Sequence, residues 1–359
     1  MTFVRAISSD NVSTAINKST LESKTSAVKM AWYEIPNTNA VSIYSALLFG
    51  VLTVVFVFRL WLKATCGKFE SKVRMDGKTV LITGANSGIG KETARDLAKR
   101  GARIIMACRT METANKARDQ IIKESGNENI FIKKLDLSSQ KSVREFADDI
   151  NKSESKIDVL IHNAGYANTF NKTKSVDGIE MTMATNHYGP FLLTHLLIDL
   201  LKKSAPCRIV IVASECYRFC RLNLKNLNPI DTMPGYLYYV SKFANVMFGL
   251  ELARRLKGTN ITVNMLHPGM IDSGIWRNVP FPLNIPMAFI KGFFKTTEEG
   301  AQTSLFLACS EDVKNISGKY YLDCKEWDLQ PYIIEEDKHK ILWEESAKIV
   351  KLTEKDPKI

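Results

Sequence analysis

The sequence predicts an α/β fold: a doubly wound parallel sheet with helices on both faces, preceded by an N-terminal transmembrane helix. One observation behind this prediction is that short apolar, β-branched runs alternate with amphipathic segments across residues 75–325. Strands separated by helices form right-handed crossovers, and these build a parallel sheet. The other is an uncharged run of nineteen residues, Ala40 to Phe58, before that region. With 359 residues and 45% hydrophobic content, we expect one large domain with appendages.

The N-terminal part divides into a tail and an anchor. Residues 1–39 are rich in Ser, Thr, Asn and Lys and lack apolar periodicity, which predicts a disordered tail. Residues 40–62 are the predicted transmembrane anchor, because an uncharged run of this length crosses most of a ~30 Å hydrocarbon core. More basic residues follow the run than precede it, so the positive-inside rule places the rest of the chain in the cytosol. We expect the endoplasmic reticulum membrane, with a mitochondrial membrane as the alternative.

Charge and cysteine content limit the partners. The net charge of +11 is not gathered into one basic block with interleaved aromatic residues, which argues against nucleic acid and favours an anionic membrane surface or a phosphate-bearing cofactor. The seven cysteines are scattered without metal-ligand spacing. This pattern predicts reduced thiols and no metal site.

A glycine-rich loop follows the first predicted strand, Lys78–Thr83, and precedes a helix from Lys91 to Arg100. Glycines in this position permit a tight turn and a close approach of the backbone to a pyrophosphate, which the helix N-terminus then binds. Between a strand and a helix, the motif predicts a Rossmann-type dinucleotide site. The candidate cofactor-binding residues of the loop are Gly84, Asn86, Ser87, Gly88, Ile89 and Gly90.

The second predicted strand, Arg103–Cys108, ends without the acidic residue that would bind an adenosine ribose 2′-hydroxyl. Arg109 follows it instead. An arginine there suits a 2′-phosphate, so the sequence favours NADP(H) over NAD(H). The alternative is an ordinary surface arginine.

The alternation continues along the chain. We expect helices at Thr110–Ser125, Ser138–Asn151 and Ile179–Lys202, and strands at Ile130–Leu135, Ile157–Ile161, Arg208–Ala213 and Gly318–Leu322. Asp136 and Leu137 come just after one strand, where they would meet the adenine. Asn163, Ala164 and Gly165 end the fourth strand, at the crevice where such sheets bind ligands.

The run from Tyr236 to about Lys257 predicts one helix that carries a candidate catalytic pair. Tyr238 and Lys242 lie four residues apart, so they share a helix face with Cβ atoms roughly 5–6 Å apart. An ammonium beside a phenol stabilises the phenolate, so Tyr238 could exchange a proton with a substrate oxygen. The alternative is an incidental pair on a helix surface.

Three motifs in order, TGxxxGxG from Thr83, NAG at Asn163 and YxxxK at Tyr238, make the chain resemble the short-chain dehydrogenases/reductases from about Gly77 to Cys324. Within that family it is most similar to the retinol dehydrogenase branch. The signatures of this second resemblance are Ala107-Cys108-Arg109, NHYGPFLLT from Asn186, His267-Pro268-Gly269, EEGAQT from Glu298 and LWEES from Leu342.

The resemblance implies a role for each matching residue. Tyr238 would be the acid/base, Lys242 would lower its pKa and hold the nicotinamide ribose, and Ser214 would hydrogen-bond the reacting oxygen. Asn186 would hold a water that links Lys242 to solvent. Pro268, Gly269 and Ser273 would border the nicotinamide. One departure from the family pattern is His162, which stands where Asn is usual.

Two later segments extend this pattern. Ile275 to Phe294 is too apolar for an ordinary solvated loop and is predicted to be a lid for a hydrophobic substrate, or else extra core packing. A helix signal resumes at Thr296, and residues 326–359 form a C-terminal extension with an amphipathic helix at Lys338–Leu352.

The sequence therefore predicts a membrane-anchored, NADP(H)-dependent oxidoreductase that interconverts a lipophilic alcohol and its aldehyde or ketone, with retinol and retinal favoured. A hydroxysteroid dehydrogenase or another lipid carbonyl reductase is the competing enzyme hypothesis. A catalytically silent, membrane-tethered cofactor-binding scaffold is the hypothesis of another class. The partners expected are the lipophilic substrate, the bilayer through residues 40–62, and a second copy of the chain through the helix that bears Tyr238.

Overall fold

The computed structural model describes residues 38–168, 171–271 and 291–359. The chain forms two compact units, Met1–Ala64 and Thr65–Ile359. The described part of the first is helix α2, Thr38–Ala64. Its segment Ser42–Ala64 has a mean hydropathy of 2.2 and is long and apolar enough to cross a membrane, which makes it a candidate span by length and composition. The predicted disordered tail lies almost entirely outside the described residues.

The second unit is built on a sheet with the strand order β3-β2-β1-β4-β5-β6-β7-β8. The strands are β1 Thr79–Thr83, β2 Arg103–Cys108, β3 Ile130–Lys134, β4 Val159–His162, β5 Cys207–Val212, β6 Ile261–His267, β7 Lys319–Leu322 and β8 Lys325–Glu326. Neighbours from β3 to β7 pair in parallel, and β8 pairs antiparallel with β7. The winding reverses between β1 and β4, so the strand ends open a crevice at that switch point.

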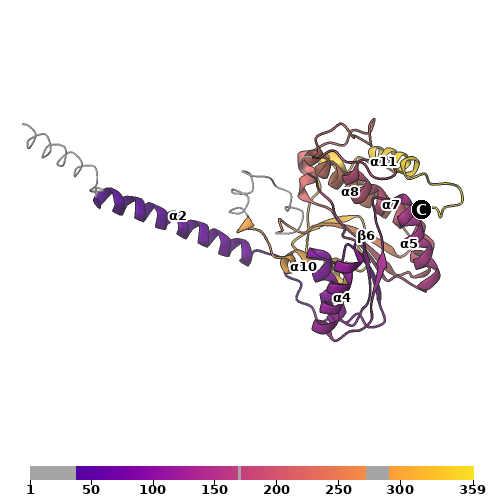
Figure 1. Cartoon of the computed structure of the whole chain (residues 1–359), viewed down its shortest axis with the longest axis horizontal. Helices are drawn as coiled ribbons and strands as arrows, with labels where there is room; N and C mark the ends of the chain where they lie inside the picture. The colour runs from indigo at the N-terminus through magenta and orange to yellow at the C-terminus, as the bar shows by residue number, and fades with distance from the viewer. Residues whose placement is uncertain (1–37, 169–170, 272–290) are drawn as a thin grey trace, which may run out of the picture. The chain divides into compact units, whose positions relative to one another are not determined.

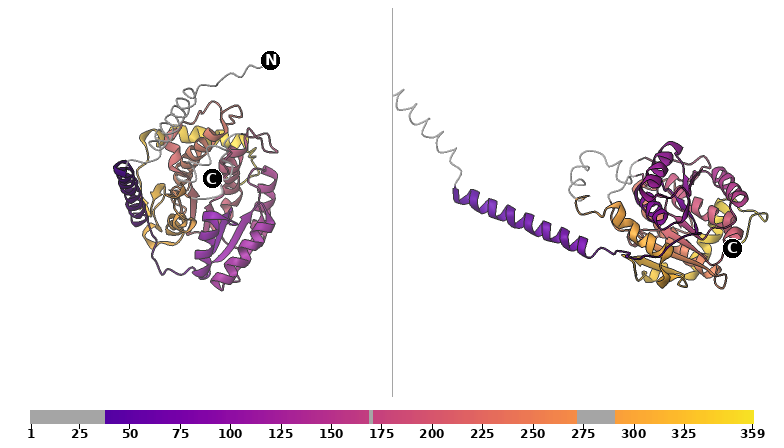
Figure 2. Two further views of the ribbon diagram at one scale, coloured as in Figure 1. Left: turned by 60° about the vertical axis from the view of Figure 1, so that its left-hand side comes forward. Right: turned by 90° about the horizontal axis from the view of Figure 1, so that it is seen from below.

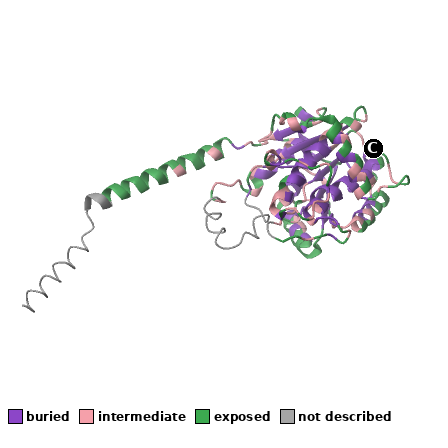
Figure 3. Ribbon diagram, turned by 90° about the horizontal axis from the view of Figure 1, so that it is seen from above, coloured by how far each residue is buried: buried purple, intermediate pink, exposed green. Residues whose placement is uncertain are grey.

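Helices cover both faces of the sheet (Figures 1 and 2). On one face lie α3 Gly88–Lys99, α4 Met111–Ser125 and α10 Thr297–Cys309. On the other lie α5 Gln140–Ser153, α7 Gly189–Lys203 and α8 Pro234–Arg255, with α11 Glu336–Ile349 packed on α8. Each strand sends alternate side chains to the two cores: Leu81 faces the second group of helices, whereas Val80 and Ile82 face the first. Purple ribbon in Figure 3 shows how completely the central strands are buried.

The structure confirms the doubly wound fold and differs from the prediction in three elements. The short strand β8 follows the strand at 318–322 that was expected to be the last. Strand β6 was not predicted, although Ile261, Val263 and Met265 alternate with more polar residues and are buried. The single helix expected over 179–202 is instead α6 Met181–Met183, a π-helical turn Ala184–Tyr188, and α7. Most of the predicted lid lies outside the described residues.

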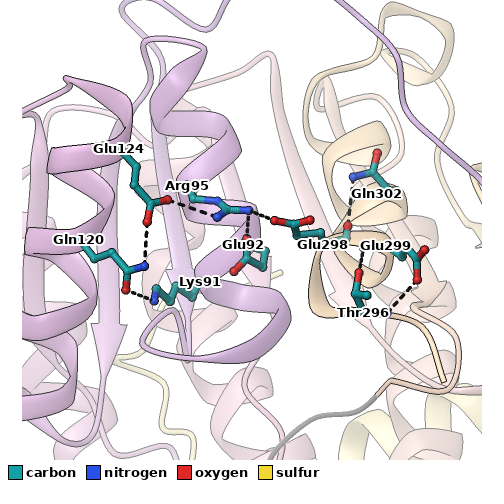
Figure 4. A network of polar contacts seen from close by, with 9 residues as sticks. All are labelled: Lys91, Glu92, Arg95, Gln120, Glu124, Thr296, Glu298, Glu299 and Gln302. Atoms are coloured by element: carbon teal, nitrogen blue, oxygen red, sulfur yellow. Dashed lines mark hydrogen bonds and ion pairs between the residues drawn. The ribbon is translucent and has the colours of Figure 1, made fainter. Parts of the chain in front are cut away.

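A polar network joins α10 to α3 (Figure 4). Thr296 caps α10, because the Glu299 amide donates to Thr296 Oγ1 at 3.1 Å and the Thr296 amide donates to Glu299 Oε2 at 2.8 Å. Arg95 of α3 donates to Glu298 Oε1 at 2.5 Å and to Glu124 Oε2 at 3.2 Å. The first turn of α10 is thereby fastened to the helix that follows the glycine-rich loop.

Candidate active site

Asn186 lies in the π-helical turn Ala184–Tyr188. Such a turn contains one residue more than an α-helical turn, and it is common at functional sites. Asn186 Nδ2 donates to Tyr166 O at 2.8 Å and to Ser241 Oγ at 3.0 Å, and its Oδ1 accepts from the Tyr166 amide at 2.7 Å. The buried side chain is therefore fixed to the segment after β4 and to α8.

Tyr238 and Lys242 occupy the same face of α8, as their spacing predicts. Lys242 Nζ lies 5.6 Å from the centroid of the Tyr238 ring and donates to Val212 O at the end of β5, at 2.8 Å. Ser241, the residue between Asn186 and this pair, donates from Oγ to Tyr238 O at 2.7 Å. The helix thus places the phenol and the ammonium on one face, and Ser241 links the Asn186 amide to the backbone of Tyr238.

Ser214 follows β5 and caps a short 3₁₀ turn, Glu215–Phe219, by accepting from the Cys216 amide at 3.3 Å. Its hydroxyl also hydrogen-bonds the Tyr238 phenol and lowers its pKa, but burial has the larger effect and raises that pKa above its ordinary value. This net direction differs from the expected lowering by Lys242. The reason is that the half-buried ring lies partly among protein atoms, which solvate a phenolate less well than water does. At neutral pH Tyr238 is a protonated phenol able to donate.

Burial acts on Lys242 in the opposite sense, because it disfavours the charged form of a base. The pKa of Lys242 is lowered to about 8. The side chain is still mostly an ammonium at neutral pH.

The glycine-rich loop has the predicted geometry. Gly84 has a φ of +67°, and a Cβ there would lie 2.9 Å from Ala164 Cα, so only glycine lets β1 and β4 approach. Gly88, at a φ of +57°, faces open space within 4 Å of where its Cβ would be. A Cβ on Gly90 would collide with the Asn163 amide. Gly84 and Gly90 therefore pack the turn, while Gly88 leaves the approach to the α3 N-terminus clear.

The other loop residues surround that N-terminus. Ser87 is the N-cap residue of α3 but makes no side-chain capping bond, and Ile89 packs against the core on the α3 face. Asn86 Nδ2 donates to Thr113 Oγ1 at 2.9 Å. Arg109, at the end of β2, is exposed and has no hydrogen bond or ion pair within the described ranges. The Arg109 guanidinium just after β2 therefore has no partner among the described residues.

The residues expected near the adenine are already engaged in local contacts. Asp136 Oδ1 accepts from the Ser138 amide at 3.0 Å and from Ser138 Oγ at 2.7 Å. Leu137 is buried and lies so close to Gly189 that a Cβ there would collide with its carbonyl. Asp136 shapes the turn after β3, and Leu137 packs it on α7.

The turn after β4 is held by a residue that the sequence reasoning left out of the site, Thr83. Its Oγ1 accepts from the amides of Asn163 and Ala164, both at 3.0 Å. Asn163 Nδ2 donates to Thr83 O at 2.9 Å. Thr83 opens the TGxxxGxG motif, so its place there was the available signal. A Cβ on Gly165 would lie 3.9 Å from Lys242 Nζ, so this turn adjoins the catalytic pair.

The candidates after β6 are partly described. Pro268 is buried and Gly269 has a φ of +93°, with the Lys295 side chain against it. Ser273 lies outside the described residues.

His162, the departure from the family pattern, is buried and shares a 2.8 Å hydrogen bond between Nε2 and Thr194 Oγ1. Burial lowers the pKa of His162 to about 3, so it is a neutral core residue.

The arrangement fits a dinucleotide cofactor. The backbone at Gly88 is open, the first turn of α3 presents amides without intrahelical acceptors, and Arg109 offers an unpaired cation beyond β2. At the other side of the switch point, the Ser214 hydroxyl hydrogen-bonds the Tyr238 phenol, and the Lys242 ammonium lies 5.6 Å from the centroid of the Tyr238 ring. Such a set can transfer a proton beside a bound redox cofactor.

Comparison with known proteins agrees with this geometry. The family model of the short chain dehydrogenases matches residues 78–281. Retinol dehydrogenase 14 of Mus musculus is 46% identical over 290 residues, which cover 77% of this chain and 86% of the mouse protein. Retinol dehydrogenase 11 of Homo sapiens is 42% identical over 286 residues, covering 77% and 89%. Among solved structures, the Pseudomonas aeruginosa RhlG/NADP active-site complex matches with a TM-score of 0.57 at 26% identity, covering 70% of this chain and 96% of that one.

Proposed function

The chain belongs to the short-chain dehydrogenase family, and from this premise we propose that it is a membrane-anchored, NADP(H)-dependent oxidoreductase that interconverts a lipophilic alcohol and its aldehyde or ketone. The observation that carries the proposal is the half-buried Tyr238 among four buried polar residues, Asn186, Ser214, Ser241 and Lys242. Burying an ammonium and an amide costs free energy unless they are hydrogen-bonded, and a scaffold that only binds a cofactor does not need a phenol, an ammonium, a hydroxyl and an amide together.

In the reducing direction, the Ser214 hydroxyl and the Tyr238 phenol hydrogen-bond the carbonyl oxygen of the substrate and polarise it. Tyr238 then gives its proton to that oxygen, and the Lys242 ammonium stabilises the phenolate that remains. Asn186 keeps the backbone of Tyr238 in place through Ser241. The nicotinamide cofactor supplies the hydride when it is bound. Pro268, Gly269 and Ser273 are the proposed border of the nicotinamide site.

The cofactor proposal rests on the first half of the sheet. Gly84, Asn86, Ser87, Gly88, Ile89 and Gly90 would hold the pyrophosphate at α3, and Asp136, Leu137, Asn163, Ala164 and Gly165 would line the adenosine and ribose side. The exposed Arg109 supports NADP(H) over NAD(H) because it can pair with a 2′-phosphate. The complex of RhlG with NADP supports the same choice.

Retinol and retinal are the favoured substrate pair, because relatives at 42–46% identity over most of both chains are named retinol dehydrogenases. A hydroxysteroid or another lipid carbonyl stays the alternative substrate class. A catalytically silent scaffold stays the alternative of another class. Comparing turnover of retinal with turnover of ketosteroids separates the first two.

The candidate span supports a bilayer as partner, with residues 40–62 as the anchor, residues 1–39 as the tail, 75–325 as the catalytic domain and 326–359 as its extension. The basic residues after the span support a cytosolic catalytic domain. The endoplasmic reticulum membrane is favoured over a mitochondrial one because Asp10, Glu22 and the low arginine content of the leader are unlike a mitochondrial address. A homodimer remains a prediction. Along α8 only Tyr239 and Arg254 are exposed, so a second copy would have little of this helix to bind.

The test is to follow NADPH and NADH oxidation by membranes containing the full chain, with all-trans-retinal as substrate. Tyr238→Phe is the control for chemistry, since it removes the proton and keeps the ring. Arg109→Ala is the control for cofactor choice, and it should reduce the preference for NADPH by about tenfold, the value of one charged hydrogen bond. NADPH-dependent turnover that is lost in Tyr238→Phe supports the proposal. NADPH binding without turnover of any lipid carbonyl overturns it in favour of the scaffold.

A further inference from the structure

Helix α11 packs directly on the turn that carries Asn186. Ser346 Oγ of α11 and His187 Nε2 of the turn share a hydrogen bond of 3.0 Å, and both residues are fully buried. His187 is the next residue after Asn186. The C-terminal extension therefore touches the active-site turn one residue away from a candidate catalytic side chain.

The same helix inserts Trp343 between α7 and α8. The Trp343 ring lies 5.0 Å from the ring centroids of Phe191 and His195 and 5.9 Å from that of Phe248. The guanidinium of Arg255 lies 4.3 Å from the Trp343 ring centroid. Phe191 lies in the first turn of α7, which follows the π-helical turn directly. Trp343 therefore packs beside the C-terminal end of the π-helical turn.

These contacts connect two stretches of which the catalytic proposal used only Asn186. The stretch NHYGPFLLT, residues 186–194, supplies His187 and Phe191, and LWEES, residues 342–346, supplies Trp343 and Ser346. His187 is also packed against the rings of Tyr188, at 5.0 Å, and Phe248, at 6.0 Å. Burial lowers the pKa of His187 to about 4, so its ring stays neutral. The contact with Ser346 is accordingly a fixed hydrogen bond and not a charge switch.

We propose that α11 is a positioning element of the active site, in which Ser346, acting through His187, holds the π-helical turn so that Asn186 keeps its bonds to Tyr166 and Ser241. The route to the reaction is short. Asn186 donates to Ser241, and Ser241 donates to the carbonyl of Tyr238. Ser346 and His187 touch no reacting atom. The kinetic part of this proposal rests on the proposed oxidoreductase function, whereas its structural part does not.

The experiment compares three full-length variants in detergent with the unaltered chain. Ser346→Ala removes the hydroxyl that meets His187, and Ser346→Thr retains one. Ser304→Ala is the matched control, because Ser304 on α10 is equally buried and its hydroxyl has no hydrogen-bond partner among the described residues. Two quantities are measured: kcat and KM for NADPH with retinal, and hydrogen exchange of the Tyr166 amide, which donates to Asn186 Oδ1.

For Ser346→Ala we expect kcat to fall about tenfold, KM for NADPH to stay within about twofold, and the Tyr166 amide to exchange about tenfold faster, as expected for one lost buried hydrogen bond. Ser346→Thr should recover most of both changes, and Ser304→Ala should show neither. A loss of packing alone would lower the melting temperature without this split between kcat and KM.

An unchanged exchange rate of the Tyr166 amide in Ser346→Ala overturns the proposal, whatever the turnover. An unchanged kcat in the presence of faster exchange overturns its kinetic part. If the unaltered chain turns over no lipid carbonyl, the oxidoreductase proposal fails by itself, and the exchange rates alone decide whether α11 positions Asn186.

Discussion

Helices α2 and α8 are the two longest in the described chain and both are rich in apolar residues, yet they differ in what they bury. In α2, large apolar side chains such as Phe49 and Val54 are exposed, at 73% and 68%. In α8, polar side chains are buried, among them Ser241, Lys242 and Glu251. Apolar residues facing out and polar residues facing in are the two informative exceptions to ordinary burial. The first exception marks the candidate membrane span and the second marks the candidate active site.

The largest effect on activity should come from replacing a buried polar side chain of α8 with an apolar one. Lys242→Met replaces the buried ammonium with an apolar side chain of similar length. We expect kcat/KM for retinal reduction to fall by about 10²-fold or more, as when acid–base help is lost. The melting temperature should not fall with it, since removing a buried charge relieves its desolvation cost. A variant that unfolds at lower temperature in proportion to its lost activity would contradict this.

The corresponding change in α2 is to add a charge where apolar residues face out. Val54→Lys places an ammonium near the centre of the candidate span, at a cost of about 3 kcal/mol for membrane insertion. We expect the share of the protein that stays in the membrane pellet after alkaline extraction to drop. Val176→Lys is the control, because Val176 is 85% exposed in the catalytic unit. Equal extraction of both variants would contradict the proposal that α2 spans a membrane.

One substitution made in both helices sharpens the comparison. Val246 in α8 is fully buried, so Val246→Ala leaves a cavity and should cost about 2 kcal/mol of unfolding free energy, or several degrees in Tm. Val54→Ala in α2 leaves no cavity in a core and should not move Tm. Thermal unfolding of the purified chain in detergent measures both. A Tm lowered equally by the two changes would mean that α2 is part of the packed body.

The smallest effect concerns pH. The pKa of Lys242 in the free protein is about 8, so its ammonium is lost as pH rises through that value. We expect kcat/KM for reduction to fall by about tenfold per pH unit above about 8, since kcat/KM follows the free enzyme. The residual activity of Lys242→Arg should lack this limb, because a guanidinium stays charged. An unchanged limb in that variant would assign it to another group.

Local patterns were sufficient to predict most of the fold. The β-branched runs 103–108 and 208–213 and the glycines after Thr83 are signals within a few residues, and the structure has strands and a glycine turn there. Strand β6 was not predicted although Ile261, Val263 and Met265 alternate with Thr262 and Asn264. Asn264 is a polar residue that is buried in the strand, where its amide donates to Ile316 O in the loop before β7 at 2.6 Å. That partner is distant in sequence.

The residues of the candidate site could be predicted from the sequence, but most of the contacts between them could not. The spacing of Tyr238 and Lys242 could be read directly, whereas the π-helical turn at Asn186 has no pattern of its own. Spacing after a strand also does not show that Ser138 donates to Oδ1 of the Asp136 carboxylate. The net rise in the pKa of Tyr238 also depends on burial by segments far away along the chain, which spacing on one helix cannot show.

The order of the elements along the chain determines the order in which they are synthesised. Helix α11 leaves the ribosome after every strand of the sheet and after α8, and domains generally fold as units during and after synthesis. If Ser346 and Trp343 complete the turn at Asn186, the catalytic group cannot be assembled while those residues are still unmade. Helix α2 emerges first and is available to a membrane throughout. A nascent chain would therefore be targeted before it is competent, and a carbonyl substrate would meet an active enzyme only after the protein has reached its membrane.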